Sequence, residues 1–431
     1  MSSATSPGRA RKLILAVIDG LTPEAFEDAV ERRKAPALAA LSDVGTYGRA
    51  VSTFPSLTPV CLATLATGAH PDVHAIPHLV WYHREEARIV EYGSSFGAMR
   101  VAGTRRSIRD AIVEMNAHHL SREAVTVFES LEDAGLTAAA VNTPCYRGRT
   151  RHVPTVPGVV RPVDGPRRFF YFSLFESDVT GAPLAIRTRT GGSIDSYAAA
   201  VGRWLVTRDG FDFLFYYLPD YDYASHALGP EGADEALRRS DQAIGALIDA
   251  AGGLDEFLER YAVVVCSDHG QTRVNRVVRL QGSVPDLVTA SNRAGMVYTA
   301  QPRTVAERLA GSDGVDVVLF REDGAAYALR DGGELRLDGA NAGWERRAVR
   351  ALANPNAGEV LVSAEKGVEF ADLGGRHHAG GGSHGSLLDG DSLVPMLVAG
   401  VDGEPPRDIA AVAGLVLDHF GIESPAYARA A

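Results

Sequence analysis

The chain has 431 residues, of which 45% are hydrophobic and 23% charged, and its formal net charge is −11. This length predicts about three domains of roughly 150 residues, or one large domain with insertions. The composition excludes a disordered, collagen-like or coiled-coil chain. The surplus of acidic residues disfavours a nucleic-acid polymer or an anionic membrane as the partner.

Neither the cysteines nor the N-terminus indicates export. Three cysteines, Cys61, Cys145 and Cys266, do not make a disulfide scaffold in a chain of this length. An apolar run at residues 13–18 follows basic residues, as in a signal peptide, but it is too short and ends at Asp19. No apolar run approaches the roughly 18 residues of a membrane helix. We therefore expect a cytoplasmic protein.

The predicted elements alternate between strands and helices, which is typical of an α/β fold. Continuous apolar runs predict buried strands at residues 13–18, 213–218, 261–266 and 393–399. Pro395 in the last run favours an edge strand or a bulge. Start and stop residues predict helices from Thr22-Pro23 and from Thr58-Pro59 to Gly68. An amphipathic pattern predicts a helix over 234–251, and about 408–420 is also expected to be helical. We predict a mostly parallel sheet sandwiched by helices.

Two stretches differ from this pattern. Residues 84–192 carry many arginines and turns, and residues 285–375 contain short elements rich in Gly and Asp. We interpret both as inserted caps, which leaves a core at 10–83, 193–284 and 376–425. The arginines fit a solvated face, and contact with a phosphate-rich substrate is the alternative.

Acidic and histidine side chains follow several predicted strands or lie in glycine-rich loops. They are Asp19, Asp222, His226, Asp268, His269 and His384. Ligands of open parallel sheets bind beyond the carboxyl ends of the strands, so we expect these groups to gather there. Oxygen and nitrogen donors together suit Zn²⁺, with Mn²⁺ or iron as weaker options. Each residue alone could be a turn or cap residue, but their joint occurrence favours a metal site.

Thr58 is the candidate nucleophile. Its hydroxyl stands at a predicted helix start, where free backbone N–H groups favour an anionic phosphate. A metal would lower the pKa of the hydroxyl. The alternatives are that Thr58 only caps the helix, or that Ser56 or Cys61 supplies the nucleophile.

In this order the segments resemble the alkaline phosphatase superfamily, and most closely its nucleotide pyrophosphatase/phosphodiesterase branch. The resemblance covers residues 10–82, 195–285 and 376–425 and implies an alkaline-phosphatase-like fold. The motifs are Thr58 before a helix ending in Thr67-Gly68 with Pro71 and His74 beyond it, the segment 222–230 with Ser225 where Gly is usual, Asp268-His269-Gly270, and His384-Gly385.

The resemblance also implies a ligand set and a mechanism. One metal ion would be held by Asp222, His226 and His384, and a second by Asp19, Asp268, His269 and the Thr58 oxygen. Thr58 would form a covalent phosphothreonine intermediate that water then hydrolyses. The implied substrate is a small phosphate- or phosphonate-containing molecule, with a phosphodiester or nucleotide pyrophosphate as the first choice.

The chain departs from the family pattern at Leu79, where an Asn that contacts a phosphate oxygen is usual. We consider His78 as a candidate substrate-binding residue in its place. His377 and His378 compete with His384 for the late ligand position. Metal binding by His70, His74 and His78 is disfavoured, because nearby prolines break the helix that their spacing would need.

Other functions of the same scaffold stay open. The alternatives are a phosphonoacetate-type carbon–phosphorus hydrolase or a phosphomonoesterase, and beyond those a catalytically idle metal-binding protein. A sulfatase is disfavoured, because Cys61 is followed by Leu-Ala-Thr rather than by the sulfatase pattern x-Pro-x-Arg.

Overall fold

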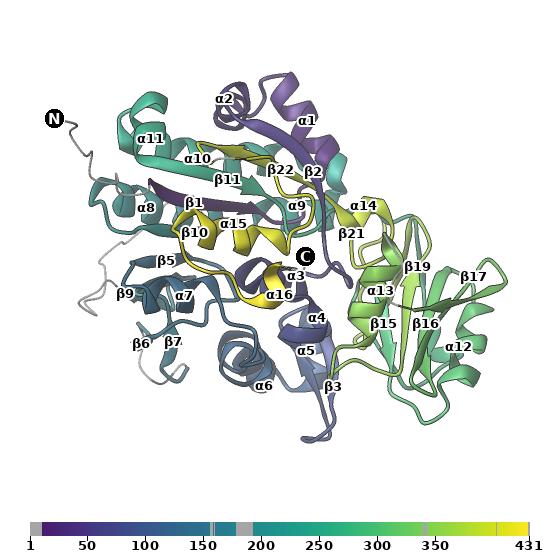
Figure 1. Cartoon of the computed structure of the whole chain (residues 1–431). Coiled ribbons are helices and arrows are strands. Elements are labelled where there is room, and N and C mark those ends of the chain that lie inside the picture. Colours follow the sequence, from purple (N-terminus) through teal and green to yellow (C-terminus); the bar gives the residue numbers. More distant parts are fainter. Residues whose placement is uncertain are drawn as a thin grey trace.

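A central sheet organises the molecule. The structure, a computed structural model, describes residues 11–155, 158, 160–177, 193–338, 343–401 and 403–429. Within these residues the sheet has eight strands, with helices on both faces (Figure 1). In spatial order the strands are β2 (Thr46–Val51), β22 (Leu393–Ala399), β11 (Tyr261–Cys266), β1 (Lys12–Ile18), β10 (Phe213–Leu218), β5 (Ala138–Val141), β8 (Arg168–Tyr171) and β9 (Phe175–Ser177).

The sheet is mostly parallel, as predicted. β11, β1, β10, β5 and β8 run parallel to one another, whereas β2/β22, β22/β11 and β8/β9 are antiparallel pairs. Successive residues of β1 enter different cores: Leu13 and Leu15 face one, and Ile14 faces the other. A strand buried on both faces must be apolar throughout, which explains the continuous runs in the sequence.

Helices cover the two faces of this sheet. The core that contains Leu13 also includes residues of α3 (Thr58–Thr67), α7 (Val127–Asp133) and α15 (Ala411–His419). The core that contains Ile14 includes residues of α1 (Pro23–Glu31), α2 (Pro36–Val44), α8 (Ile194–Thr207), α10 (Asp234–Ala251) and α11 (Leu254–Arg260). The helices predicted at Thr22-Pro23, Thr58-Pro59 and 234–251 are therefore present.

The stretch predicted as the first cap, 84–192, is not only a cap, because β5, β8 and β9 are strands of the central sheet. Their runs are short and alanine- or aromatic-rich, so the sequence did not reveal them as core strands. Two short elements, α4 (Pro71–His74) and β3 (Val80–His83), lead into this region. Its other elements are β4 (Arg88–Glu91), α5 (Phe96–Ala102), α6 (Thr104–Arg109), a π-helix (Asp110–His119), β6 (Thr150–His152) and β7 (Val163–Gly165). Residues 178–192 lie outside the described residues.

A second sheet occupies most of the stretch predicted as the second cap. In spatial order its strands are β14 (Leu287–Val288), β15 (Ala294–Val297), β19 (Val360–Ala364), β16 (Val315–Glu322), β17 (Ala325–Arg330) and β18 (Gly333–Leu337). Two helices accompany it, α12 (Pro302–Ala310) and α13 (Trp344–Leu352). In Figure 1 this lobe lies to the right of the central sheet, beside α14 (Asp389–Ser392).

Pro395 lies neither at the sheet edge nor at a bulge, contrary to the prediction. β22 has neighbours on both sides, and β2 forms the edge. The pairing of β22 with β11 ends at Met396, so Pro395 pairs only with Arg49 of β2. The missing N–H of proline is tolerated there because it falls beyond the ladder with β11.

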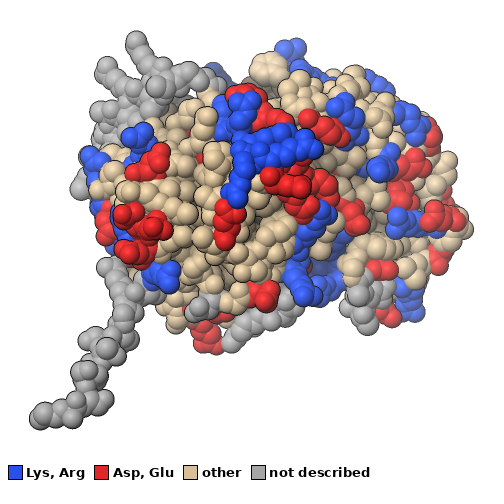
Figure 2. Space-filling model, turned by 90° about the horizontal axis from the view of Figure 1, so that it is seen from above, with Lys and Arg blue, Asp and Glu red and all other residues tan. Residues whose placement is uncertain are grey.

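The surface carries both signs of charge. On the face shown in Figure 2, basic and acidic side chains intermingle over a largely uncharged background. No helix in the described ranges combines the length and the apolar character needed to cross a bilayer.

Candidate active site

Three neighbouring strands deliver most of the candidate residues to one place. β1 lies between β10 and β11 in the parallel part of the sheet, so their carboxyl ends are adjacent. Asp19 follows β1, and α9 (Asp220–Leu228) follows β10, whereas Asp268 and His269 follow β11. Gly20 permits the close approach, since its φ is +68° and a Cβ there would lie 2.8 Å from Oδ1 of Asp222.

One group of candidate ligands consists of Asp222, His226 and His384. Asp222 and His226 lie one turn apart on α9, with His226 Nε2 3.3 Å from Asp222 Oδ2. His384 follows the short strand β21 (Gly382–Ser383), and its Nε2 lies 3.8 Å from Asp222 Oδ1. The three residues form a geometric metal-binding group, with ligand atoms within 4.8 Å of one another.

A second group surrounds Nε2 of His269. This atom lies 3.3 Å from Asp19 Oδ1, 3.5 Å from Asp268 Oδ2 and 3.1 Å from Thr58 Oγ1. The geometric group here joins Asp19 and His269 with Asp222, which therefore belongs to both groups. The rings of His269 and His384 stack with centroids 3.7 Å apart, so the two groups are neighbours.

The three histidines share one hydrogen-bonding arrangement. Each ring has its Nδ1 against a main-chain carbonyl: His226 at 2.9 Å from Gly382, His269 at 3.0 Å from Gly270 and His384 at 2.7 Å from Ser56. A carbonyl only accepts, so each Nδ1 carries a proton, and Nε2 is the ring atom that faces the carboxylates. Metal-binding histidines are oriented by the same kind of Nδ1 hydrogen bond.

The carboxylates form a buried acidic cluster. Asp19 Oδ1 and Asp268 Oδ2 are buried and have no hydrogen-bond partner. Burial and the neighbouring acids raise the pKa of Asp19, and burial also raises the pKa of Asp268. Burial alone would raise the pKa of Asp222 too, but His226 and His384 hold it below its usual range. Unpartnered oxygens facing nitrogen lone pairs fit divalent metal ions of the Zn²⁺ type.

Thr58 does not cap its helix. The N-cap of α3 is Leu57, and Thr58 is the first helical residue, with no side-chain cap bond. Its Oγ1 instead lies 3.1 Å from His269 Nε2. The hydroxyl is therefore available for chemistry. Ser56 is committed elsewhere, since its Oγ donates to the carbonyls of Thr53 and Ser386, and burial raises the pKa of Cys61.

Two residues that the sequence did not single out as site residues hold the carboxylates. Tyr217 of β10 donates a hydrogen bond to Asp19 Oδ2. Gln271 donates from Nε2 to Asp222 Oδ1 at 2.5 Å, and Ser225 donates to Oε1 of the same Gln271. Ser225, which departs from the family pattern, thus orients Gln271. In the register of β1 and β10, Val17 pairs with Tyr217, so Tyr217 lies close to Asp19, two residues after Val17.

A cavity of about 310 Å³ opens onto these groups. Beside Asp19, Thr58, Asp222, His226 and His384, its lining includes aromatic and apolar side chains: Leu79, Tyr92, Met115, Tyr171, Phe172, Tyr217 and Tyr223. None of the described residues that line it is Lys or Arg. A larger cavity of about 960 Å³ lies against α13 and α14, but no candidate ligand lines it.

The structure does not bring His78 to this cavity. The ring is fully buried, and its Nδ1 accepts a hydrogen bond from the N–H of Val80. Leu79, in the position of the usual Asn, does line the cavity. Of the competing pair, His377 is exposed, and His378 lines the cavity with its Nδ1 2.6 Å from Glu369.

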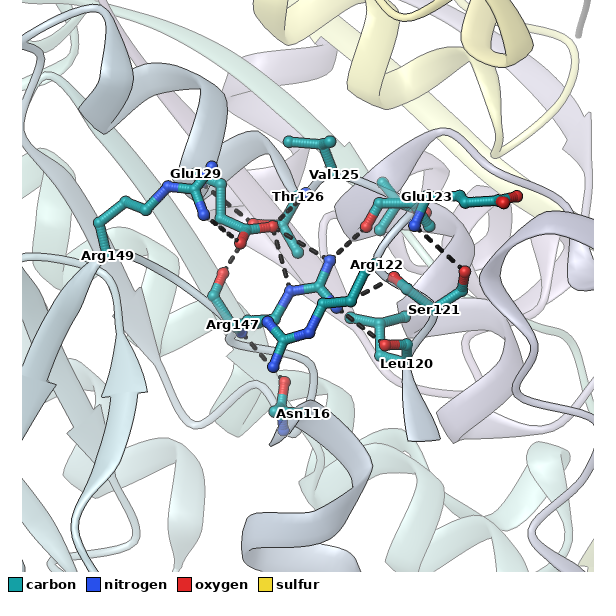
Figure 3. Close-up of polar contacts among 12 residues, drawn as sticks. Asn116, Leu120, Ser121, Arg122, Glu123, Val125, Thr126, Glu129, Arg147 and Arg149 are labelled. Carbon is teal, nitrogen blue, oxygen red and sulfur yellow. Dashed lines mark hydrogen bonds and ion pairs between the residues drawn. The ribbon is translucent and has the colours of Figure 1, made fainter. Parts of the chain in front are cut away.

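The arginine-rich stretch is held together largely by its own ion pairs and carbonyl contacts. Arg147 is 3% exposed and donates to Glu129 and to the carbonyls of Leu120 and Ser121 (Figure 3). Arg149 pairs with the other oxygen of Glu129 at 2.9 Å. Neither arginine lines the cavity that contains Thr58.

The chain matches a known protein family over most of its length. The family model for type I phosphodiesterase/nucleotide pyrophosphatase matches residues 13–387. The chain belongs to this family. No curated protein matches it. Membership in this family supports a hydrolase of phosphoric esters.

Solved structures share the fold at low identity. An inactive variant of murine ectonucleotide pyrophosphatase/phosphodiesterase 5, in complex with AMP, has a TM-score of 0.64 at 14% identity and covers 96% of each chain. The human form of that protein has the same TM-score and identity, again covering 96% of each chain. Phosphonoacetate hydrolase from Sinorhizobium meliloti, with phosphonoformate, has a TM-score of 0.63 at 18% identity and covers 96% of this chain and 97% of its own. At these identities the likeness concerns the fold.

Proposed function

We propose that the protein is a two-metal phosphodiesterase that acts through a covalent phosphothreonine at Thr58. The observation that carries this proposal is the shared arrangement of His226, His269 and His384: each Nδ1 lies against a main-chain carbonyl, and each Nε2 lies within 3.8 Å of a carboxylate oxygen. Bound cations would use both the Nε2 atoms and the carboxylate oxygens as ligands. Asp222, His226 and His384 would hold one ion, and Asp19, Asp268, His269 and Thr58 the other.

The residues of the chain would then perform the reaction as follows. Two bound Zn²⁺ ions would lower the pKa of the attacking hydroxyl and neutralise charge on the phosphoryl oxygens. Thr58 attacks phosphorus in line, the bond to the leaving alcohol oxygen breaks, and a phosphothreonine forms. Water then cleaves this ester, which regenerates the hydroxyl and releases the phosphate product. Thr58 begins α3, so the positive end of the helix dipole lies at the phosphate.

The lining of the cavity favours a phosphodiester over a phosphonoacetate-type substrate. A substrate with a carboxylate beside its phosphonate brings a second anion, which a cationic side chain would ordinarily bind. The lining offers aromatic rings instead, among them Tyr171, Phe172 and Tyr223, and neither Lys nor Arg. Such a surface suits an uncharged, planar group on the ester.

The buried free thiols of Cys61, Cys145 and Cys266 fit a reducing, cytoplasmic compartment.

The test is hydrolysis by the zinc-loaded protein of bis(p-nitrophenyl) phosphate, p-nitrophenyl phosphate and phosphonoacetate. We expect the diester to give the highest kcat/KM, and Thr58→Ala to lower it by at least about 10³-fold, because the nucleophile is lost. The zinc content of the variant should stay near that of the parent. Turnover retained in Thr58→Ala would remove Thr58 from the mechanism, and preference for phosphonoacetate would replace the proposed substrate class.

A further inference from the structure

The cavity that contains Thr58 offers few side-chain hydrogen-bond donors for a phosphoryl group. Leu79 lines it, but an aliphatic side chain donates no hydrogen bond. The described lining residues include no Lys or Arg. A buried side-chain donor that lines the same cavity is therefore a candidate phosphate contact.

Asn292, between β14 and β15, lines the same cavity as Thr58 and Leu79. It is 1% exposed, and its Oδ1 accepts a hydrogen bond from the N–H of Ala294 at 2.8 Å. Its Nδ2 is buried and has no hydrogen-bond partner. A buried amide N–H without a partner is costly, and beside a ligand cavity it is explained by a partner that arrives with the ligand.

The backbone of Asn292 is held on both sides. Its carbonyl accepts from the N–H of Phe370 at 2.9 Å, and the next residue, Arg293, donates from its N–H to the carbonyl of His384 at 2.9 Å. The amide is therefore tied to the loop that carries a candidate metal ligand. A donor fixed in this way loses little conformational entropy when it binds.

Several other polar side chains of the lining already use their donors. Tyr217 donates to Asp19, and the hydroxyl of Ser291 donates to the carbonyl of Arg376 at 2.8 Å. The hydroxyl of Tyr92 lies 2.8 Å from Nδ1 of His119. Tyr171 and Tyr223, which is 58% exposed, also line the cavity, and their hydroxyls remain competing donors.

We infer that Asn292 is the phosphate-contacting residue of this enzyme: its Nδ2 donates a hydrogen bond to a non-bridging oxygen of the phosphoryl group that is transferred to Thr58. This inference rests on the proposed function. The contact would come from the second cap rather than from the segment after α3.

The experiment compares Asn292→Ala and Asn292→Asp with the parent, all zinc-loaded. Asn292→Asp keeps the acceptor for Ala294 and removes the amide donor, so it tests the contact even if the alanine variant folds poorly. Asn354→Ala is the matched control. Asn354 is fully buried and makes the same turn, with Oδ1 accepting from the N–H of Asn356 at 2.8 Å, but its Nδ2 already donates to Pro71 and it does not line the cavity.

Two readouts are needed: kcat/KM for bis(p-nitrophenyl) phosphate, and the Kd of inorganic phosphate by calorimetry. A lost hydrogen bond to a charged group predicts an about 10- to 100-fold fall in kcat/KM and a weaker phosphate Kd in both Asn292 variants, with zinc content unchanged. Asn354→Ala should lower the melting temperature and leave both readouts within about threefold.

The proposal is overturned if a zinc-loaded Asn292 variant keeps kcat/KM and the phosphate Kd within about threefold of the parent. It is equally overturned if Tyr223→Phe alone produces the loss. The Thr58→Ala variant separates this result from the proposed function, because it abolishes diester turnover whichever residue contacts the phosphate.

Discussion

Neighbouring groups hydrogen-bond to the side chains that we propose as metal ligands. The carbonyls that accept from the histidines set the ring tautomers, and Tyr217 and Gln271 donate to the carboxylates of Asp19 and Asp222. Such partners orient ligands and tune their affinity for the ion, so their loss is expected to weaken metal binding without unfolding the chain.

Tyr217→Phe tests this at one residue. We expect zinc affinity and kcat/KM to fall by about 10-fold, because Asp19 loses a hydrogen bond that orients it. The measurement is zinc competition with a chromophoric chelator. The matched control is Tyr216→Phe, one residue away on β10, whose hydroxyl donates to the carbonyl of Ala243 in the opposite core. Equal zinc affinities in both variants would show that Tyr217 does not act on the ligand.

Among single residues, the sequence predicted the candidate metal ligands better than the residues that hydrogen-bond to them or line the cavity beside them. Asp19, Asp222 and Asp268 could be proposed because each follows a strand that is recognisable from its apolar run. Tyr217 lies inside such a run and resembled a core residue, and Asn292 lies in a cap that matches no motif. His78 was proposed as a substrate-binding residue because it is next to Leu79 in the sequence, but its side chain is buried and does not line the cavity.

Helix α3 places the nucleophile, and a buried histidine packs beside it. His74 accepts the N–H of Ile76 at Nδ1 and lies 3.2 Å from Thr64 of α3 at Nε2. Burial lowers the pKa of His74 to about 3. The folded state therefore keeps this ring neutral at pH values where the unfolded chain protonates it.

Burial of His74 is expected to make the folded state less stable at low pH. Below the ordinary histidine pKa of about 6.5 the unfolded state binds more protons, so stability falls as the pH falls toward 3. Between pH 6.5 and pH 5 we expect His74 to lower the free energy of unfolding of the parent by about 2 kcal/mol. His74→Gln should not show this loss. Urea unfolding at several pH values measures the difference between the two proteins. Parallel curves for parent and variant would contradict the assignment.

The arginine-rich stretch is predicted to act through stability rather than substrate binding. Arg147→Met leaves the buried Glu129 without its innermost partner, so we expect about 3 kcal/mol of destabilisation in urea unfolding. The folded variant should keep its kcat/KM. Arg151→Met is the control, because its pair with Asp164 is 60% and 58% exposed and should matter by no more than about 0.5 kcal/mol. A fall in kcat/KM for zinc-loaded Arg147→Met would restore the substrate-contact interpretation.

Elements were predictable where local pattern and burial agree. Strands β1, β10 and β11 were found because a parallel sheet needs apolar runs. Helices α1 and α3 were found because each has a proline in its first turn, and α10 because it is long and amphipathic. β5 and β8 were missed, because short runs inside an arginine-rich stretch give no sign that β5 pairs with β10 and β8 with β5. The position of Pro395 depended on where the pairing of β22 with β11 ends, which a single strand does not encode.

The whole molecule brings together residues from four separate stretches, at 19–20, 58, 217–271 and 384. The order of strands in the sheet does most of this, since β1 lies between β10 and β11. The second lobe adds Asn292 to the same cavity. The proposed phosphate contact is thus expected to depend on the lobe, and metal binding on the central sheet.

Anomalous X-ray diffraction at the zinc edge, from crystals of the zinc-loaded protein, tests the two-metal site most directly. We predict two peaks about 4 Å apart. One should be bounded by Asp222, His226 and His384, and the other by Asp19, Asp268 and His269 with the Thr58 oxygen beside it. A single peak, or zinc bound away from these side chains, would contradict the account.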